Sequence, residues 1–380
     1  MVRDQDKALV SVSDAIEAMR RGETVIMVDD EDRENEGDLV FAAEHVTPEK
    51  INFMAKDARG LICLAMEPQL IDKLKLPMME DAAKDFPHRR TAFTVSIEAK
   101  HGVTTGISAH DRSTTVQAAI ADSASPTDIV VPGHIFPLKS RPGGVLERAG
   151  HTEGSVDLAR LAGFKSAAVI CEIMNDDGSM ARLPDLVKFA ARHNIKIVSI
   201  ADLITYRLLR ESLVEIVEKT AIHTAFGNFE AVVAYSIIDQ CTHVALIKGN
   251  NFANQVVDVR VHQQRALPDA LLDAPDVKNW SVASFMKNMQ TAECAVLVYL
   301  VREHNRDDLR REIAEIALDD EVAEKLAPPP MALRQYGVGA QILRALGVRQ
   351  MRLHANSPRS IKALAGFGLE IVETVLRKDA

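Results

Sequence analysis

The sequence predicts an α+β protein of two domains, from its length, its mixture of strand-like and helix-like segments, and a change in their arrangement after the first 200 residues. The chain has 380 residues, and a single hydrophobic core rarely serves more than about 250–300 residues. Strands and helices intermix in the first part, whereas the second part opens with three strand-like runs in succession. A charge-rich segment at 201–220 reads as a helical connector, so we expect domains at 1–207 and 208–380.

The first domain is predicted from caps and periodicity. Ser11 and Ser13 offer N-caps to a helix over 11–22, and Gly22 stops it. A second helix begins at Thr47-Pro48 and ends at Gly60. The remaining predicted elements are strands at 24–28, 61–67, 91–99, 166–173 and 196–200 and helices at 111–122, 153–163 and 183–194.

The second domain is expected to be an α/β unit. Its first three strands are predicted at 227–238, 242–250 and 255–263, and a fourth at 292–301. A highly charged helix follows, and the prolines of 327–331 must break it. The end of the chain predicts a helix and then two strands.

Composition indicates a cytoplasmic protein that binds neither nucleic acid nor membrane. The net charge is −9 and the pI is near 5.8, which opposes binding to polyanions. No apolar run approaches the roughly 20 residues that span a bilayer, and the N-terminus lacks a secretion signal. The four cysteines are far apart without a CxxC pair, so we expect no disulfide framework.

Residues 29–38, DDEDRENEGD, place seven carboxylates directly after the apolar strand at 24–28. A solvated surface loop is the ordinary explanation of an acidic run. Arg33 and Gly37 favour a shaped loop instead, with Gly37 allowing the turn. Carboxylates that converge at a strand end can bind a hard cation such as Mg²⁺, which prefers oxygen ligands.

A second group of polar residues lies at 132–154, with two histidines, two arginines and five glycines. Arg148, His151 and Thr152 occupy a Gly-rich turn that leads into a predicted helix. Backbone N–H groups at a helix start, together with Arg and a hydroxyl, form a phosphate-sized anion site. A Gly-rich loop with an ordinary helix cap is the alternative.

Two further stretches contain residue types that are common in catalytic sites. Glu172 lies inside an apolar strand, where a carboxylate is costly unless it is paired or works near a metal. Burial also raises the pKa of a carboxylate toward the range of a general base. The segment 102–115 is rich in hydroxyls and opens a helix at Asp111-Arg112. Together these stretches predict a metal-assisted reaction on a small phosphorylated molecule.

Four motifs resemble those of 3,4-dihydroxy-2-butanone-4-phosphate synthase in order and spacing, over roughly residues 8–207: DDEDRENEGDL, TTGISAHDRSTT, RPGGVLERAGHTE and CEIMNDDGSMAR. The resemblance implies a lyase of riboflavin biosynthesis that converts D-ribulose 5-phosphate into L-3,4-dihydroxy-2-butanone 4-phosphate and formate. It implies a homodimer with active sites at the subunit interface. It also implies Mg²⁺ or Mn²⁺, two ions per active site, which stabilise an enediolate.

The resemblance assigns residues position by position. Glu34 and His151 resemble the metal ligands, and His134 and Glu172 resemble the catalytic acid and base. Imidazole is not a typical Mg²⁺ ligand, so Mn²⁺ is an alternative. Cys63 lies where some members have a cysteine near the substrate, although a small buried apolar residue is the simpler explanation. The substrate-binding positions are Arg33, Glu34, Asp38, Arg148, Ala149, Gly150, His151, Thr152 and Glu172.

Most of residues 215–377 resembles GTP cyclohydrolase II, through THVALIKGN, VRVH, YGVGAQILRALGV and GFGLEIVE. The family's three zinc cysteines fall at Arg265, Asp276 and Lys278, and no cysteine lies between Cys241 and Cys294. The family's GRGIGL loop is replaced by VREHNRDD. Because that zinc site needs thiolates, we expect no zinc and no GTP cyclohydrolase II activity.

Two alternatives stay open. The chain is a bifunctional enzyme if a modified second site uses His262, Asp269 or Asp276 as ligands, and bound zinc would favour this. It is a non-catalytic scaffold or regulator of riboflavin synthesis if the first site is inactive, which the intact motifs oppose. An inactive second domain would stabilise the dimer, bind another pathway enzyme, or regulate through a vestigial nucleotide site.

Overall fold

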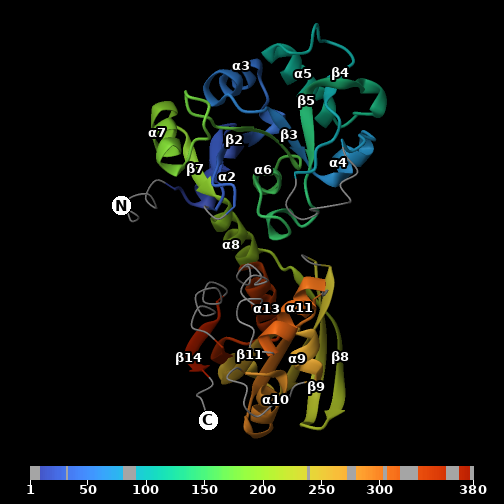
Figure 1. Ribbon diagram of the computed structural model, residues 1–380, viewed down its shortest axis with the longest axis vertical. Coiled ribbons are helices and arrows are strands. Elements are labelled where there is room, and N and C mark those ends of the chain that lie inside the picture. Colours follow the sequence, from blue (N-terminus) through green and yellow to red (C-terminus); the bar gives the residue numbers. More distant parts are fainter. Residues whose placement is uncertain are drawn as a thin grey trace. The chain divides into compact units, whose positions relative to one another are not determined.

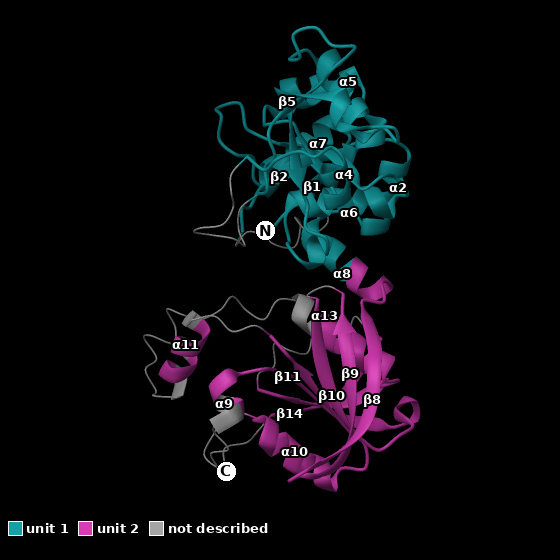
Figure 2. Ribbon diagram, turned by 90° about the vertical axis from the view of Figure 1, so that its right-hand side faces the viewer, with its two compact units in different colours: residues 1–206 teal, residues 207–380 magenta. Residues whose placement is uncertain are grey.

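A computed structural model describes residues 9–30, 33–79, 91–237, 240–271, 280–302, 306–316, 333–356 and 368–376. The chain forms two compact units, Met1–Tyr206 and Arg207–Ala380 (Figure 2). The described residues of each unit build a seven-stranded sheet with helices packed on it. The predicted α+β class is therefore confirmed.

The sheet of the first unit has the order β4-β5-β3-β6-β2-β1-β7 (Figure 1). β1 pairs with β7, and β3 with β5, in parallel; the other neighbours are antiparallel. The strands are β1 (Val25–Val28), β2 (Gly37–Ala42), β3 (Cys63–Met66), β4 (Ile97–Ala99), β5 (Ile129–Lys139), β6 (Ala167–Glu172) and β7 (Lys196–Ser199). The helices are α2 (Val12–Arg20), α3 (Pro48–Phe53), α4 (Pro68–Lys73), α5 (Ala109–Ile120), α6 (His151–Leu161), α7 (Leu183–His193) and α8 (Ile200–Arg210).

Helix α6 is the buried helix of this unit and sets the position of the site. It packs on β1, β2, β3 and β6, and residues 151–159 are all buried. A Cβ at Gly154 would collide with Met27 Sδ of β1, so the glycine allows the close approach of helix and strand. The first residue of α6, His151, is thereby held at the sheet.

The opposite face of the sheet carries α3, α5 and α7. Their side chains Ile51, Val116 and Leu186 share one apolar cluster with Leu39 of β2 and other strand residues. Burying such side chains provides the main stabilising free energy, roughly 25 cal/mol per Å² of apolar surface. The alternating strand residues, such as Asp38 and Val40 of β2, consequently face α6.

Several expected boundaries are confirmed, and one is wrong. Ser11 accepts the N–H of Asp14 as the N-cap of α2, and Thr47 caps α3 ahead of Pro48. The second helix does not end at Gly60. It continues as a π-helical turn, Met54–Ala58, and stops at Arg59, which has a left-handed φ of 68°.

Three other expectations need correction. The strand at 91–99 shrinks to β4, and strand β5, for which no strand was predicted, occupies the first part of the polar stretch at 132–154. The helical connector at 201–220 ends at Arg210, and β8 begins at Val214. The β-branched residues of 214–224 pair with β9, and this pairing overrides their helix-like charge pattern.

The second unit has the strand order β14-β13-β11-β12-β10-β9-β8. Its strands β8 to β10 and β12 form antiparallel pairs, while β11 pairs with β12 and β13 in parallel. The strands are β8 (Val214–Thr224), β9 (Gly227–Ser236), β10 (Cys241–Lys248), β11 (Val256–Gln263), β12 (Ala295–Leu300), β13 (Gln350–Ala355) and β14 (Glu370–Leu376). The helices are α9 (Ala266–Leu271), α10 (Val282–Thr291), α11 (Arg306–Ile316) and α13 (Leu333–Ala345).

The predicted end of the chain, a helix followed by two strands, is confirmed by α13, β13 and β14. Outside the described residues lie the proline break at 327–331, Glu31 and Asp32 of the acidic run, and two of the expected zinc positions, Asp276 and Lys278. In the described part of the chain, no helix combines the length and hydrophobicity needed to traverse a bilayer.

Candidate active site

The acidic run is organised by Asp29, the residue that follows β1. Its side chain is only 1% exposed. One carboxylate oxygen accepts the backbone N–H of Glu36 at 2.8 Å, and the other accepts the N–H of Glu34 at 3.1 Å and Nη1 of Arg33 at 2.8 Å. Asp29 therefore folds the run back on itself and fixes where Glu34 points.

The turn of this loop comes from Asn35, which has a left-handed φ of 55°. The expectation that Gly37 provides the turn is wrong. Gly37 is the first residue of β2, and a Cβ there would collide with Leu186 of α7, so its role is close packing. Arg182 closes the loop from outside by donating to the carbonyl oxygens of Glu34, at 2.6 Å, and Asn35.

Glu34 and His151 meet at the start of α6. Glu34 Oε2 lies 3.8 Å from His151 Nδ1 and accepts a hydrogen bond from Arg33 Nη1 at 2.6 Å. The positive charge of His151, followed by that of Arg33, lowers the pKa of Glu34 to about 2 although partial burial opposes this. Glu34 is thus ionised at neutral pH.

Asp38 and Glu172 occupy paired positions on neighbouring strands. Asp38 of β2 is in register with Glu172 of β6, so both side chains project from the same face of the sheet. Burial, reinforced by Glu172, raises the pKa of Asp38 to about 7 although His151 opposes it. Glu172 Oε2 accepts the N–H of Leu61 at 2.9 Å. The two carboxylates therefore lie side by side on one face of the sheet.

His151 completes this cluster. Its Nε2 lies 3.9 Å from Asp38 Oδ1, too far for a hydrogen bond. Within the described residues this buried nitrogen has no hydrogen-bond partner. Burial lowers the pKa of His151, but the carboxylates of Asp38 and Glu34 outweigh it and raise the pKa to about 9.

These side chains could hold a divalent cation. Ligand atoms of Asp29, Glu34 and His151 all lie within 4.8 Å of one another. Asp29 already accepts three N–H groups, so Glu34 and His151 are the freer donors. A carboxylate with an imidazole suits Mn²⁺ and is compatible with Mg²⁺, and the unpartnered nitrogen of His151 fits a site that a ligand completes.

A basic group lies next to the cluster. Arg148 is bound to Glu153 at 2.7 Å and to the hydroxyl of Thr91 at 3.3 Å. A Cβ on Gly150, the N-cap of α6, would collide with Arg148 Nη1 and lie 3.0 Å from Arg33 Nη2. Two guanidinium groups therefore converge on a helix start, which is suited to an anion.

Of the other expected substrate positions, Ala149 is exposed and Thr152 is buried. Cys63 is buried in β3, and burial, followed by the charge of Glu172, raises the pKa of its thiol. A thiol that stays protonated agrees with the simpler explanation of Cys63 as a small apolar residue.

The structure does not bring His134 into the cluster. His134 lies on β5 with its Nδ1 2.7 Å from Glu98 Oε2 of β4. Among the contacts of the described residues, none joins this pair to Glu34, His151 or Glu172. The sequence pattern therefore grouped residues that lie at two separate places within the chain.

Three residues shape these places although the sequence assigned none of them a specific role. Asp29 and Arg182 hold the loop, and their contacts could not be inferred from spacing. Glu98 could have been found, because it is a carboxylate in the apolar run TVSIEA, the same signal that singled out Glu172.

The second unit has its own histidine and acid, where the alternative site was expected. His262 Nε2 lies 2.9 and 3.0 Å from the two oxygens of Asp269, which also accepts the hydroxyl of Tyr299 at 3.0 Å and the N–H of Arg265 at 2.8 Å. Glu312 of α11 accepts the N–H groups of Ala266 and Leu267 at the start of α9. These polar groups are satisfied by one another.

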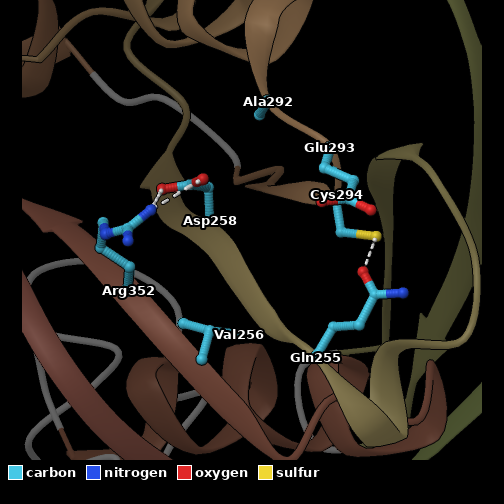
Figure 3. A pocket seen from close by; sticks show the side chains of 7 residues that line it. All are labelled: Gln255, Val256, Asp258, Ala292, Glu293, Cys294 and Arg352. Carbon is cyan, nitrogen blue, oxygen red and sulfur yellow. Dashed lines mark hydrogen bonds and ion pairs between the residues drawn. The ribbon is translucent and has the colours of Figure 1, made fainter.

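A cavity of about 630 Å³ opens elsewhere in this unit (Figure 3). It lies at the amino ends of the parallel strands β11 and β12, whereas ligands of open α/β sheets bind at the carboxyl ends. Asp258 and Arg352, which line it, are paired at 3.3 Å, and Cys294 donates to Gln255. We therefore do not assign the cavity to catalysis.

The fold holds an acidic, imidazole-bearing cluster beside a helix start that is suited to an anion. Residues 13–206 match the family described as 3,4-dihydroxy-2-butanone 4-phosphate synthase, and residues 215–376 match GTP cyclohydrolase II. The chain belongs to the 3,4-dihydroxy-2-butanone 4-phosphate synthase family and is an enzyme of riboflavin biosynthesis, fused to a GTP cyclohydrolase II-like unit.

Relatives span nearly the whole chain. The riboflavin biosynthesis protein RibBA of Aquifex aeolicus is 50% identical over 374 residues, covering 96% of this chain and 91% of the relative. A 3,4-dihydroxy-2-butanone 4-phosphate synthase of Pseudomonas aeruginosa is 48% identical over 369 residues, covering 96% and 98%. The crystal structure of RibBX, a two-domain synthase from A. baumannii, superposes with a TM-score of 0.79 at 43% identity, covering 96% and 99%.

Proposed function

We propose that the first unit converts D-ribulose 5-phosphate into L-3,4-dihydroxy-2-butanone 4-phosphate and formate with the help of Mg²⁺ or Mn²⁺. The observation that carries this proposal is the cluster of Glu34, Asp38, His151 and Glu172 next to a basic helix start. Such a site matches a substrate with a phosphate at one end and oxygens that chelate a cation at the other. The family membership gives the substrate class.

Different residues of the chain have different proposed roles in binding and in proton transfer. Arg148, Arg33 and the start of α6 hold the phosphate and so orient the sugar. Glu172 and His134 are the proposed acid and base, and since they lie apart within one chain, His134 would act across the proposed dimer interface. Asp38 can hold or release a proton near neutral pH because its pKa is about 7. Ala149 and Thr152 stay predicted contacts of the phosphate segment.

Glu34 and His151 are the proposed ligands of the cation. When bound, the ion supplies a Lewis acid that stabilises negative charge on substrate oxygens. Arg33 orients Glu34 through its 2.6 Å hydrogen bond and balances its charge. The second ion per site and the use of Mn²⁺ stay predictions that metal analysis of the purified protein tests.

A direct assay tests this function. The full chain is incubated with D-ribulose 5-phosphate and Mg²⁺, Mn²⁺ or EDTA, and formate and the four-carbon phosphate are measured. We expect equal amounts of both products with metal and none with EDTA. Absence of product with every metal would favour the non-catalytic scaffold.

We further propose that the second unit has no GTP cyclohydrolase II activity. Support comes from the missing cysteines between Cys241 and Cys294 and from His262, whose Nε2 is taken by Asp269. Arg and Lys in place of thiolates cannot hold zinc. The alternative, a bifunctional enzyme with a modified site, predicts stoichiometric bound zinc and formate release from GTP, and both are measured on the same preparation.

A homodimer is the proposed assembly. Near His134 the side chains of Ile107, Val130 and Val131 are strongly exposed, and apolar surface of this kind is typical of an interface. Light scattering should give twice the chain mass, and Val131→Asp should shift the protein toward monomer. A native chain that is monomeric at assay concentration would contradict the proposal.

A further inference from the structure

The segment 102–115 was singled out for its hydroxyl groups, but the proposed function uses none of them. In the structure this segment packs next to His134, with Gly106 close to its Nδ1 atom. Thr115 of α5 has its hydroxyl 2.7 Å from Glu98 Oε1, and Glu98 Oε2 is 2.7 Å from His134 Nδ1. Three side chains from three elements therefore form one line of hydrogen bonds.

The direction of these bonds follows from the chemistry of the groups. An ionised carboxylate only accepts, so the Thr115 hydroxyl, which also lies 2.9 Å from the Asp111 carbonyl oxygen, donates to the nearer Glu98 oxygen at 2.7 Å. His134 donates from Nδ1 to the other Glu98 oxygen. A neutral His134 is consequently held as the Nδ1–H tautomer, with its lone pair on Nε2. The Glu98 side chain is 10% exposed and that of His134 is 42% exposed, so the line runs from the interior to the surface.

The surrounding backbone keeps the line rigid. The Thr115 oxygen accepts the N–H of Ala99, which anchors it to β4 beside Glu98. Asp111 accepts the hydroxyl of Thr104 at 2.8 Å and the N–H of Gly106 at 3.0 Å, and so folds the loop before α5. A Cβ at Gly106 would collide with both Glu98 and His134, and its φ of 89° also favours glycine.

We propose that Glu98, held by Thr115, is a positioning residue that fixes the orientation and tautomer of His134 for proton transfer. The inference rests on the proposed acid or base role of His134. It also gives the segment 102–115 a function, because Thr115 and the loop around Gly106 hold Glu98 in place. The proposed effect of Glu98 on the reaction passes through the imidazole that it contacts.

Glu98→Gln is the central variant, because it keeps the size of the side chain and removes its charge and one acceptor. We expect kcat for formate release from D-ribulose 5-phosphate to fall about 100-fold, at the low end of what acid–base catalysis contributes. Thr115→Val should cause a smaller loss, and Thr115→Ser, which keeps the hydroxyl, should restore near-normal activity. Glu44→Gln, which changes an exposed carboxylate that accepts the N–H of Lys165, is the matched control and should have no effect.

Two further readouts separate positioning from a structural role. Nitrogen NMR of labelled histidine should show the Nδ1–H tautomer of His134 in the wild type and a mixture in Glu98→Gln. In a His134→Ala background, Glu98→Gln should cause no further loss. An unchanged tautomer, normal kcat of Glu98→Gln, or an equal loss in both backgrounds would overturn the inference. Full activity of His134→Ala would instead remove His134 from the proposed mechanism, whatever Glu98 does.

Discussion

In the first unit, His151 lies 3.8 Å from Glu34 and 3.9 Å from Asp38, and its buried Nε2 has no hydrogen-bond partner among the described residues. In the second unit, His262 lies 2.9 Å from Asp269, which also binds Tyr299 and the backbone. Both clusters combine imidazole and carboxylate. In the first cluster the buried imidazole nitrogen of His151 has no hydrogen-bond partner among the described residues, so we call this cluster open. In the second cluster His262 and Asp269 satisfy each other, so we call it closed.

The difference has an energetic meaning. A buried polar group without a partner costs about 1–3 kcal/mol, while a satisfied hydrogen bond to a charged group contributes about 1.5–3 kcal/mol. The open cluster is therefore a cost to the fold that a bound ligand would offset, and the closed cluster stabilises the fold without a ligand. The comparison predicts that substitutions in the first cluster affect turnover and those in the second affect stability.

Glu34→Gln should have the largest effect. It removes the charge of a proposed metal ligand, and loss of even an outer-shell partner costs roughly 10–100-fold in affinity or activity. We expect formate release to fall by more than about 100-fold and Mn²⁺ binding, measured by calorimetry, to weaken. The side chain is 44% exposed, so the circular dichroism and melting of the first unit should stay unchanged. Near-normal turnover would remove Glu34 from the site.

Asp269→Asn is the matching change in the second unit. It weakens the bonds to His262 and Tyr299, and we expect the second unit to lose about 2 kcal/mol of unfolding free energy. Trp280 is the single tryptophan of the chain and lies in this unit, so its fluorescence follows unfolding there. Turnover of D-ribulose 5-phosphate should not change at 25 °C. If turnover fell as far as in Glu34→Gln, the division of labour between the units would be wrong.

Gly150→Ala tests the basic end of the first site. The added methyl group meets the flexible ends of Arg148 and Arg33, which would move apart while the backbone stays. We expect the KM for D-ribulose 5-phosphate to rise about tenfold with a smaller change in kcat, because the lost contacts act on binding. Glu44→Gln, at an exposed position outside the site, is the control and should leave KM unchanged. A normal KM in Gly150→Ala would show that the two guanidinium groups do not hold the phosphate.

The two clusters also show how far sequence reasoning reaches. The motifs identified Arg33, Glu34, Asp38, His151 and Glu172, and the fold brings these together although more than 100 residues separate the ends of the set. Strand pairing explains why: Asp38 and Glu172 are neighbours across β2 and β6. A register of this kind is set by tertiary contacts, so spacing alone could not have given it.

The incorrect predictions about glycine residues share a physical cause. No strand was predicted at β5, because its glycine and prolines are unfavourable in a strand, yet Gly133 serves close packing on β4, where a Cβ would collide with Ile97. Similarly, Gly37 packs against Leu186 and Asn35 makes the turn. A sequence reports that a glycine is present, but only the packed structure tells whether its freedom of φ or its missing side chain matters.

The smallest expected effect concerns one cationic side chain in each unit, the half-buried Lys50 and the buried Arg260. Burial lowers the pKa of Lys50 to about 8 and that of Arg260 to about 10. In the unfolded chain a lysine has a pKa near 10.4, so between pH 8 and 10.4 the unfolded state binds more protons and stability rises with pH. The cost of burying charged Lys50 is present below pH 8 and disappears as the pH rises.

Lys50→Met removes this dependence. Relative to the variant, the wild-type first unit should gain stability from pH 7 to pH 10, by less than about 1 kcal/mol because Lys50 is only half-buried and screened by solvent. Hydrogen exchange of β1 and β2 amides, compared between variant and wild type at each pH, measures the difference. Between pH 7 and pH 9, Trp280 fluorescence should show no matching change in the second unit, because Arg260 stays charged below its pKa of about 10. A first unit whose stability difference is flat from pH 7 to pH 10 would show that Lys50 remains protonated and that its contacts with Phe41 and the Gly22 carbonyl offset its burial.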